Sequence, residues 1–410
     1  MRSVSGPRFL AARLKEARDA RSITTQLALA NLLELNTSSV SRWEDGQSAP
    51  TAEMLIKLGE ALKVRPSYFL RPLFEHGGGA VFFRSLASAR KRDLSRQRAR
   101  LRWVQEIAII IQHYVNLPAL DLPDVAAGES FRALRDDDIE GFAGALRQHW
   151  GLGDRPIPNV VEVMEKAGFV VATDEMGTTA LDGLCNWSEQ DSRPYVLLAQ
   201  DKMSFFRRQM DAAHEMAHAV LHRGLSEDDL KADFELIEQQ AFRLASAFLM
   251  PATAFALDVG SAPTLSGLLV IKDKWRVSIK AMIHRCRALS LIDAADAVQL
   301  YKYYSAKGWS REEPLDRSEP VAKPQYLAAA LRMIVSSGTR TKDDLLTNEF
   351  TLPARDIEAL LAIDEGWFSQ KSGEVIQLRL PEARSGAGAP TSGEVISFLD
   401  IADRAKVNQC

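Results

Sequence analysis

The chain has 410 residues, which is too many for one ordinary hydrophobic core, so we expect two to four domains. Its 46% hydrophobic and 26% charged residues are typical of a globular protein and exclude a largely disordered chain. The formal net charge of -3 excludes a globally basic nucleic-acid binder, so any DNA contact must come from a local patch.

Residues 7–72 are predicted to fold as a domain of short helices. Apolar side chains at helical spacing mark the first two helices: Leu10, Leu14 and Ala17, then Leu27, Ala30 and Leu33. Asn36 is positioned to cap a third helix from Thr37 to Glu44, and Gly46 closes it before Pro50 starts the next one. This order of elements predicts an all-α domain.

The third of these helices has a polar face. Val40 and Trp43 are spaced to point inward, which leaves small hydroxyl side chains and Arg42 exposed. Such a face suits the major groove of DNA, where hydroxyl and guanidinium groups recognise base edges. The alternative is a helical bundle whose polar residues are merely solvated.

The order of residues in this domain carries a further signal. It contains Arg13-Leu14-Lys15, Ala17-Arg18, Thr25-Gln26, Leu29-Ala30, Ser41-x-Trp43-Glu44-x-Gly46 and Pro50. This order resembles the phage-repressor-like (XRE) helix-turn-helix family, which implies operator binding, commonly as a homodimer on paired half-sites. The resemblance makes Gln26, Ser38, Ser39 and Arg42 the DNA-contact candidates. Glu34 departs from the family, which often has glycine in that turn.

Residues 73–125 are predicted to be a basic helical linker. Between Arg84 and Arg102 there are eight Lys and Arg residues and one acidic residue, Asp93. Such a run is usually a solvated helix face, although it could also contact phosphates without sequence preference. It leads into an amphipathic stretch from Trp103 to Tyr114, so one continuous helix is expected.

Residues 130–290 are predicted to mix helices with a few short strands. Helices are expected at 142–150 and 160–166, and strands at 168–172, 181–187 and 195–198. A long helix from Ser204 to Arg223 and another from Leu236 to Met250 follow. The whole chain is therefore expected to be mainly α with a small β-sheet.

The long helix contains the motif His214-Glu215-Met216-Ala217-His218. His214 and His218 are spaced i, i+4, so their imidazoles lie on one face and can share a Zn²⁺ ion. Glu215 can then act as general base toward water, whose pKa the cation lowers to about 7. The alternative is two surface histidines, but the apolar neighbours indicate a buried helix, where unpaired polar groups are costly.

A catalytic zinc site requires a third protein ligand. Glu238 is the best candidate, because it lies on or beside the apolar stripe of the following helix. Asp233 and Glu235 are weaker candidates in the preceding segment. His222 lies one turn beyond His218, too far for direct ligation, and an orienting or acid role is expected for it.

The motif continues with Leu221-His222, then Glu238-x-x-Ala241, Leu244-Ala245 and Phe248-Leu249-Met250-Pro251. This pattern resembles the ImmA/IrrE metallopeptidase family, some members of which carry a repressor-like head in the same chain. The resemblance implies an α+β, zincin-like domain that cleaves partner repressors in stress, phage or mobile-element responses. Gln240 stands where some members have glutamate, so ligation should fall to Glu238.

Residues 291–410 are predicted to be mostly helical, with helices at 326–335, 341–346 and 354–361 and a possible sensing or partner-binding role. Two near-copies, Gly373-Glu374-Val375-Ile376 and Gly393-Glu394-Val395-Ile396, flank a stretch rich in small residues. They could pair as strands across a flexible loop, although coincidence is the favoured explanation.

Three hypotheses for function follow. The first is a transcriptional regulator with a zinc endopeptidase domain that cleaves a repressor. The second is a DNA-binding regulator whose zinc site is structural, sensory or vestigial, and the third is an antitoxin-like protein that uses the peptidase fold for docking. Cys185, Cys286 and Cys410 form no C-x-x-C pair, and no run of about 18 apolar residues occurs. A cytoplasmic protein without membrane contact is therefore expected.

Overall fold

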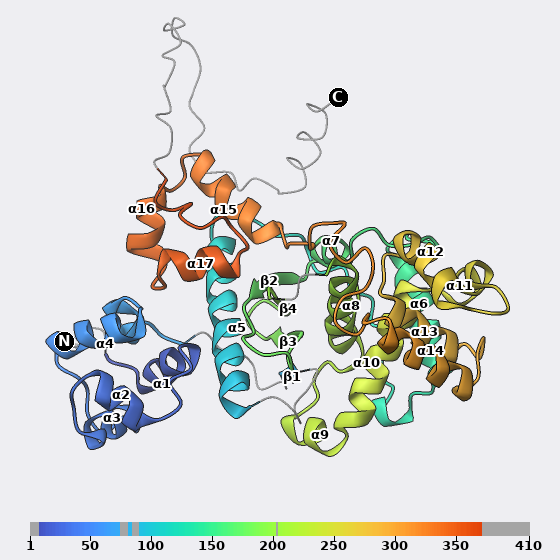
Figure 1. Cartoon of the computed structure of the whole chain (residues 1–410). Coiled ribbons are helices and arrows are strands. Elements are labelled where there is room, and N and C mark those ends of the chain that lie inside the picture. Colours follow the sequence, from blue (N-terminus) through green and yellow to red (C-terminus); the bar gives the residue numbers. More distant parts are fainter. Residues whose placement is uncertain (1–7, 74–80, 84–89, 202–203, 371–410) are drawn as a thin grey trace, which may run out of the picture.

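The computed structural model describes residues 8–73, 81–83, 90–201 and 204–370. Helices dominate and one small sheet lies at the centre, which confirms the predicted fold class (Figure 1). The N-terminal head contains α1 Ala11–Ala20, α2 Gln26–Leu32, α3 Thr37–Glu44, α4 Ala52–Leu62 and the 3-10 turn η1 Pro66–Leu70.

The sheet has four strands in the order β1-β3-β4-β2. Their bounds are β1 Phe82–Phe83, β2 Val170–Asp174, β3 Gly183–Ser188 and β4 Arg193–Ala199. β2 runs parallel to β4, whereas β3 is antiparallel to both β4 and β1. Three strands lie where the sequence predicts them, and β1 is an addition from the segment predicted to be a linker.

Both faces of the sheet are buried, because successive side chains along a strand alternate between two apolar cores. Val171, Cys185 and Val196 enter one core, while their neighbours Leu184 and Leu197 enter the other. The first core is built with α7 Val160–Lys166 and α8 Phe205–Leu221, and the second with α5 Lys91–Gln112. Figure 1 shows α5 and α8 on opposite sides of the strands.

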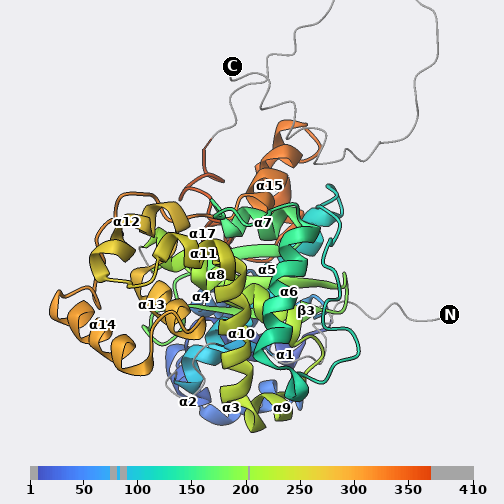
Figure 2. The same cartoon turned by 90° about the vertical axis from the view of Figure 1, so that its right-hand side faces the viewer.

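The remaining central helices surround α8. Their bounds are η2 Phe131–Ala133, α6 Asp136–His149, α9 Glu227–Ala232, α10 Phe234–Leu249, α11 Ala252–Val259, α12 Leu265–Trp275, α13 Ile279–Ala288 and α14 Ala294–Ala306. α10 packs between α8 and α6 (Figure 2). Within the described residues no single helix is long and apolar enough to cross a membrane, and only the bent pair α10 and α11 passes that test together.

The C-terminal helices pack on the sheet and on α5. α15 Tyr326–Ser336 and α17 Ala354–Leu360 pack on β2, and α15 also packs on α5. Between them lie α16 Lys342–Asp344 and a π-helical turn, η3 Leu345–Glu349. Their apolar side chains share one core with the head, α5 and the sheet. Both near-copies of Gly-Glu-Val-Ile and Cys410 lie outside the described residues.

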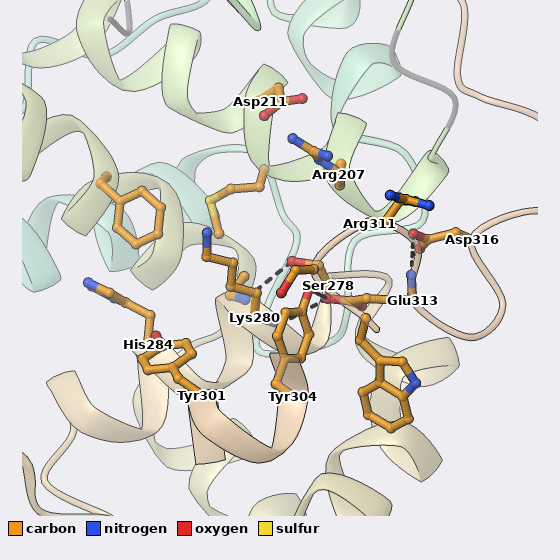
Figure 3. Close-up of a pocket in the computed structure, with 15 residues that line it drawn as sticks. Arg207, Asp211, Ser278, Lys280, His284, Tyr301, Tyr304, Arg311, Glu313 and Asp316 are labelled. Atoms are coloured by element: carbon orange, nitrogen blue, oxygen red, sulfur yellow. Dashed lines mark hydrogen bonds between the residues drawn. The ribbon is translucent and has the colours of Figure 1, made fainter. Parts of the chain in front are cut away.

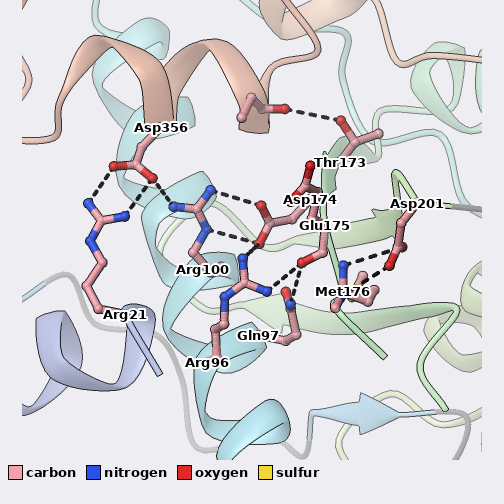
Figure 4. A network of polar contacts seen from close by, with 12 residues as sticks. Arg21, Arg96, Gln97, Arg100, Thr173, Asp174, Glu175, Met176, Asp201 and Asp356 are labelled. Atoms are coloured by element: carbon pink, nitrogen blue, oxygen red, sulfur yellow. Dashed lines mark hydrogen bonds and ion pairs between the residues drawn. The ribbon is translucent and has the colours of Figure 1, made fainter. Parts of the chain in front are cut away.

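The basic run is not simply a solvated face, since α5 is a central packing element. Arg100 is only 3% exposed and is held by Asp174 at the end of β2 and by Asp356 of α17. Asp356 also binds Arg21 of the head at 2.6 Å, and Arg96 joins the same network (Figure 4). A buried arginine requires such partners, so the solvated-face interpretation is wrong at Arg100.

Candidate metal centre and nucleic-acid interface

α8 carries the motif because it is a capped, almost fully buried helix. The Ser204 side chain accepts a hydrogen bond from the Arg207 backbone N–H, which caps the helix. One side of α8 packs on β3 and β4, and another packs on α10. His214, Glu215 and His218 are each at most 1% exposed, so they point into the protein rather than into solvent.

α10 brings Glu238 to the two histidines. Glu238 Oε2 lies 3.3 Å from His214 Nε2, and Glu238 Oε1 lies 3.2 Å from His218 Nε2. The two Nε2 atoms are 3.1 Å apart. A tetrahedral zinc ion with ligand bonds of about 2.0–2.1 Å needs neighbouring donors about 3.3 Å apart. The chemistry and spacing of these three donors therefore fit such an ion.

The other predicted carboxylates lie elsewhere. Asp233 pairs with Arg132, and Glu235 is exposed. Burial raises the pKa of the Glu238 carboxyl, but hydrogen bonds from His214 and His218 outweigh it and bring the pKa down to about 2. Glu238 is therefore an anion at neutral pH, as a zinc ligand must be.

Glu215 lies against β3 at a position that only glycine leaves open. A Cβ atom on Gly183 would sit 2.9 Å from Glu215 Oε1 and 3.0 Å from its Cγ, closer than ordinary contact allows. Burial, with a smaller contribution from the Glu215 charge, raises the pKa of the neighbouring Cys185 thiol well above its usual value. Cys185 thus stays a neutral thiol, while Gly183 fixes the room available to the carboxylate.

His222 lies beside His218 and outside the three-donor cluster. Its Nδ1 is 3.1 Å from His218 Nδ1, and its Nε2 is 3.1 Å from Gln240 Oε1. Gln240 in turn donates from Nε2 to the Phe131 carbonyl at 2.6 Å. Burial, reinforced by His218, lowers the pKa of His222 to about 3. The ring is therefore neutral at pH 7, which suits orienting His218 and not the acid role considered from sequence.

A cavity of about 180 Å³ opens beside the first turns of α8 (Figure 3). Asp211 and Phe242 line it, one helical turn from Glu215 on α8 and from Glu238 on α10, respectively. Arg207 lines it from α8 beside Asp211, and Lys280 of α13 and Tyr304 of α14 line it from the other helices. This cavity therefore adjoins the helical turns that precede the donor cluster on α8 and follow Glu238 on α10.

The polar face of α3 is exposed as the sequence predicts. Ser38 and Arg42 are exposed, and Ser39 is half-buried, while Val40 and Trp43 lie in the core. The side chain of Gln26, which was expected to contact DNA, is engaged within the head, because its Nε2 donates a hydrogen bond to Glu44 Oε2 at 3.0 Å. Leu27, predicted to face inward, is 56% exposed, and Leu29 takes its place in the core.

Two family models match the chain. Residues 14–69 match the model described as Helix-turn-helix, and residues 164–287 match peptidase M78, described as an IrrE N-terminal-like domain. The chain joins a helix-turn-helix domain to an IrrE-like domain. Both resemblances drawn from the sequence are thereby confirmed. No curated protein matched the chain significantly.

The matched IrrE-like range contains the whole donor cluster and Glu215. The helix-turn-helix match contains all four DNA-contact candidates and the departure at Glu34, whose backbone φ is +56°. An L-residue is strained in that left-handed region, which explains why glycine is favoured in this turn.

Two residues beside the donor cluster were missed from sequence. Gly183 lay inside the strand predicted at 181–187, and nothing in the neighbouring sequence indicated its contact with Glu215. Phe82 belongs to the apolar run Val81-Phe82-Phe83, which marks a short strand but not its partner. Its ring stacks on the His218 imidazole with centroids 4.8 Å apart and an interplanar angle of 11°.

Proposed function

We propose that the chain is a cytoplasmic transcriptional regulator whose IrrE-like domain is a zinc-dependent endopeptidase. Its substrate would be a partner repressor or another regulatory protein, cleaved in a stress, phage or mobile-element response. The observation that carries this proposal is the spacing of His214, His218 and Glu238, which matches a tetrahedral ion, with Glu215 on the same helix.

His214, His218 and Glu238 would hold the zinc. When bound, zinc supplies a Lewis acid that polarises the scissile carbonyl and makes water more acidic. Glu215 Oε1 or Oε2 takes the proton of the attacking water and returns it to the leaving amide nitrogen as the C–N bond breaks. Gly183 limits the positions that this carboxylate can adopt. Gln240, through His222, keeps His218 turned toward the other donors.

Room for a substrate supports an endopeptidase rather than a purely structural site. The cavity that Asp211 and Phe242 line begins one turn from Glu215 and Glu238 and can accept a substrate side chain. A structural zinc site would have no use for Glu215 or for such a cavity.

The helix-turn-helix domain supports a regulatory role over general digestion. Ser38, Ser39 and Arg42 would contact operator DNA, and Gln26 would contribute only if it left Glu44. A homodimer would place two heads on paired half-sites. The domain limits 7–72, 130–290 and 291–410 remain predictions that accompany this proposal.

A test combines metal content and cleavage in one set of proteins. Wild type, Glu215→Gln and the matched exposed control Glu235→Gln are purified, and their zinc is counted by mass spectrometry. Each is then incubated with candidate repressors that carry helix-turn-helix heads, and fragments are sought. We expect wild type and both variants to hold zinc, and only Glu215→Gln to yield no fragments.

The result that would overturn the proposal is equally direct. If Glu215→Gln keeps its zinc and regulates its target genes as wild type does, proteolysis is not the mechanism. The regulator would then act through DNA binding, with the zinc site in a structural or sensory role.

A further inference from the structure

The strand β1 occupies the edge of the sheet nearest the donor cluster. It pairs antiparallel with β3, with Phe82 opposite Cys185 and Phe83 opposite Leu184. The next residue along β3 is Gly183, which lies against Glu215. Without β1, the outer backbone groups of β3 would be unpaired and would run directly to the general base.

Phe82 fills a small aromatic pocket of its own. The ring is 2% exposed, and apart from His218 it contacts His222 at a centroid distance of 5.8 Å. It belongs to an apolar cluster separate from the two main cores, formed with Phe131, Leu230 and Ile237. The pocket is thus built by η2, α9 and α10 around the C-terminal turn of α8.

An exposed strand edge with an adjoining side-chain pocket is the arrangement by which proteins bind extended peptides. Backbone hydrogen bonds to the edge give affinity, and a pocket for alternate side chains gives specificity. In β1 the residue opposite Cys185 points to the same face of the sheet as Cys185, toward α8. The pocket therefore receives a side chain from a strand lying on β3, whichever chain supplies that strand.

We propose that the chain's own Val81–Phe83 segment is an internal competitor at the candidate metal centre. By pairing with β3 and placing Phe82 in the aromatic pocket, it keeps an extended substrate off this strand edge until the substrate displaces it. This inference rests on the proposed peptidase function, and it adds a means by which the chain itself regulates access to that site.

The competitor acts from within the same chain, so it needs little intrinsic affinity. A tethered segment meets its site at a high effective concentration, and a substrate must bind tightly enough to replace it. The segment follows the helix-turn-helix domain directly and precedes α5. This position ties access to the site to the part of the chain beside the DNA-binding head.

The test uses the full-length chain carrying Glu215→Gln, so that no peptide is cut. A fluorescent peptide with the sequence of residues 79–85 is the probe, and a second peptide has alanine in place of Phe82. Their binding is measured by anisotropy, with and without zinc, in this background and after adding Phe82→Gly. The matched control is Leu73→Gly, an exposed residue of the same connection that belongs to no strand.

We expect Phe82→Gly to bind the aromatic peptide at least about tenfold more tightly than the background or the Leu73→Gly control. Tenfold corresponds to an edge that the internal segment occupies about 90% of the time. The alanine peptide should bind more weakly to every variant. If Phe82→Gly does not fold, Val81→Pro is a second test. Proline beside the strand hinders its pairing with β3, so the internal segment competes less well although the Phe82 side chain is retained.

Equal affinity in all variants, or binding that ignores the aromatic side chain, would overturn this inference. The measurement on zinc-free protein separates it from the proposed function. If the protein binds the peptide but never binds zinc, the peptidase proposal fails and the strand edge remains a peptide-binding site. The Val81–Phe83 segment would then not compete with a substrate, which overturns this inference.

Discussion

Replacing Glu238 by glutamine tests the metal centre directly. The substitution keeps the shape of the side chain and removes the anionic donor that lies 3.2–3.3 Å from both histidines. Those distances already match a tetrahedral ion, so the wild-type site needs little rearrangement to bind zinc. Substitutions in outer-shell partners of zinc ligands cost about 10–100-fold in affinity. Loss of a ligand itself should exceed this, so we expect at least about a 100-fold loss, or roughly 2.7 kcal/mol.

The assay is competition with a chromophoric zinc chelator at pH 7.5, where the Glu238 carboxyl, with its pKa of about 2, is fully ionised. Glu235→Gln is the matched control, because it changes the same group on an exposed position of the same helix. Thermal unfolding of the zinc-free proteins checks that both variants fold. A Glu238→Gln protein that binds zinc as tightly as wild type would refute the ligand assignment.

Four further outcomes are expected. Gly183→Ala should lower the rate of substrate cleavage at least about tenfold with zinc content unchanged, because its Cβ would displace Glu215; an unchanged rate contradicts this. Glu34→Gly should raise the free energy of unfolding in urea by about 1 kcal/mol, since it relieves a positive φ. Arg42→Ala should weaken operator binding by about 1–3 kcal/mol, and an unchanged footprint would exclude it as a base contact. Asp356→Asn should cost roughly 3 kcal/mol at pH 7. Burial raises the pKa of Asp356, but Arg21 and Arg100 outweigh this and lower the pKa below its usual value of 3.8, so the stabilisation is present above that pH. The gap between wild type and Asp356→Asn in urea unfolding should therefore shrink as the pH falls below 3.8.

The cluster of three candidate donors was accessible from sequence because its geometry is local. The i, i+4 spacing fixes His214 and His218 on one face of a helix, whatever surrounds that helix. Glu238 could be chosen because its own helix has an apolar stripe that shows which side faces inward. The boundaries of these two helices were also predictable to within a few residues from the caps and flanking turns.

What could not be predicted depends on partners far away in the chain. A run of arginines by itself indicates a solvated helix face. Arg100 is buried instead because Asp174 and Asp356, from distant segments of the chain, form ion pairs with it in the folded protein. Two phenylalanines in a connecting segment indicate a strand, but only the folded sheet shows that β3 is its partner. The exposure of Leu27 has a similar cause, since Leu29 and Ala30 already fill the core on that side of α2.

The head, α5, the sheet and the C-terminal helices share one apolar core, which links the stability of the head to that of the C-terminal helices. A head with its own isolated core could melt separately, whereas this one must lose contacts with α5 when it unfolds. Operator DNA at a hundredfold excess over its dissociation constant adds about 2.7 kcal/mol to the stability of the folded state. Because the core is continuous, that stabilisation extends to the sheet that carries β3. We therefore expect operator binding by the head to be coupled thermodynamically to the exposure of the β3 edge, more than a hundred residues away in the chain.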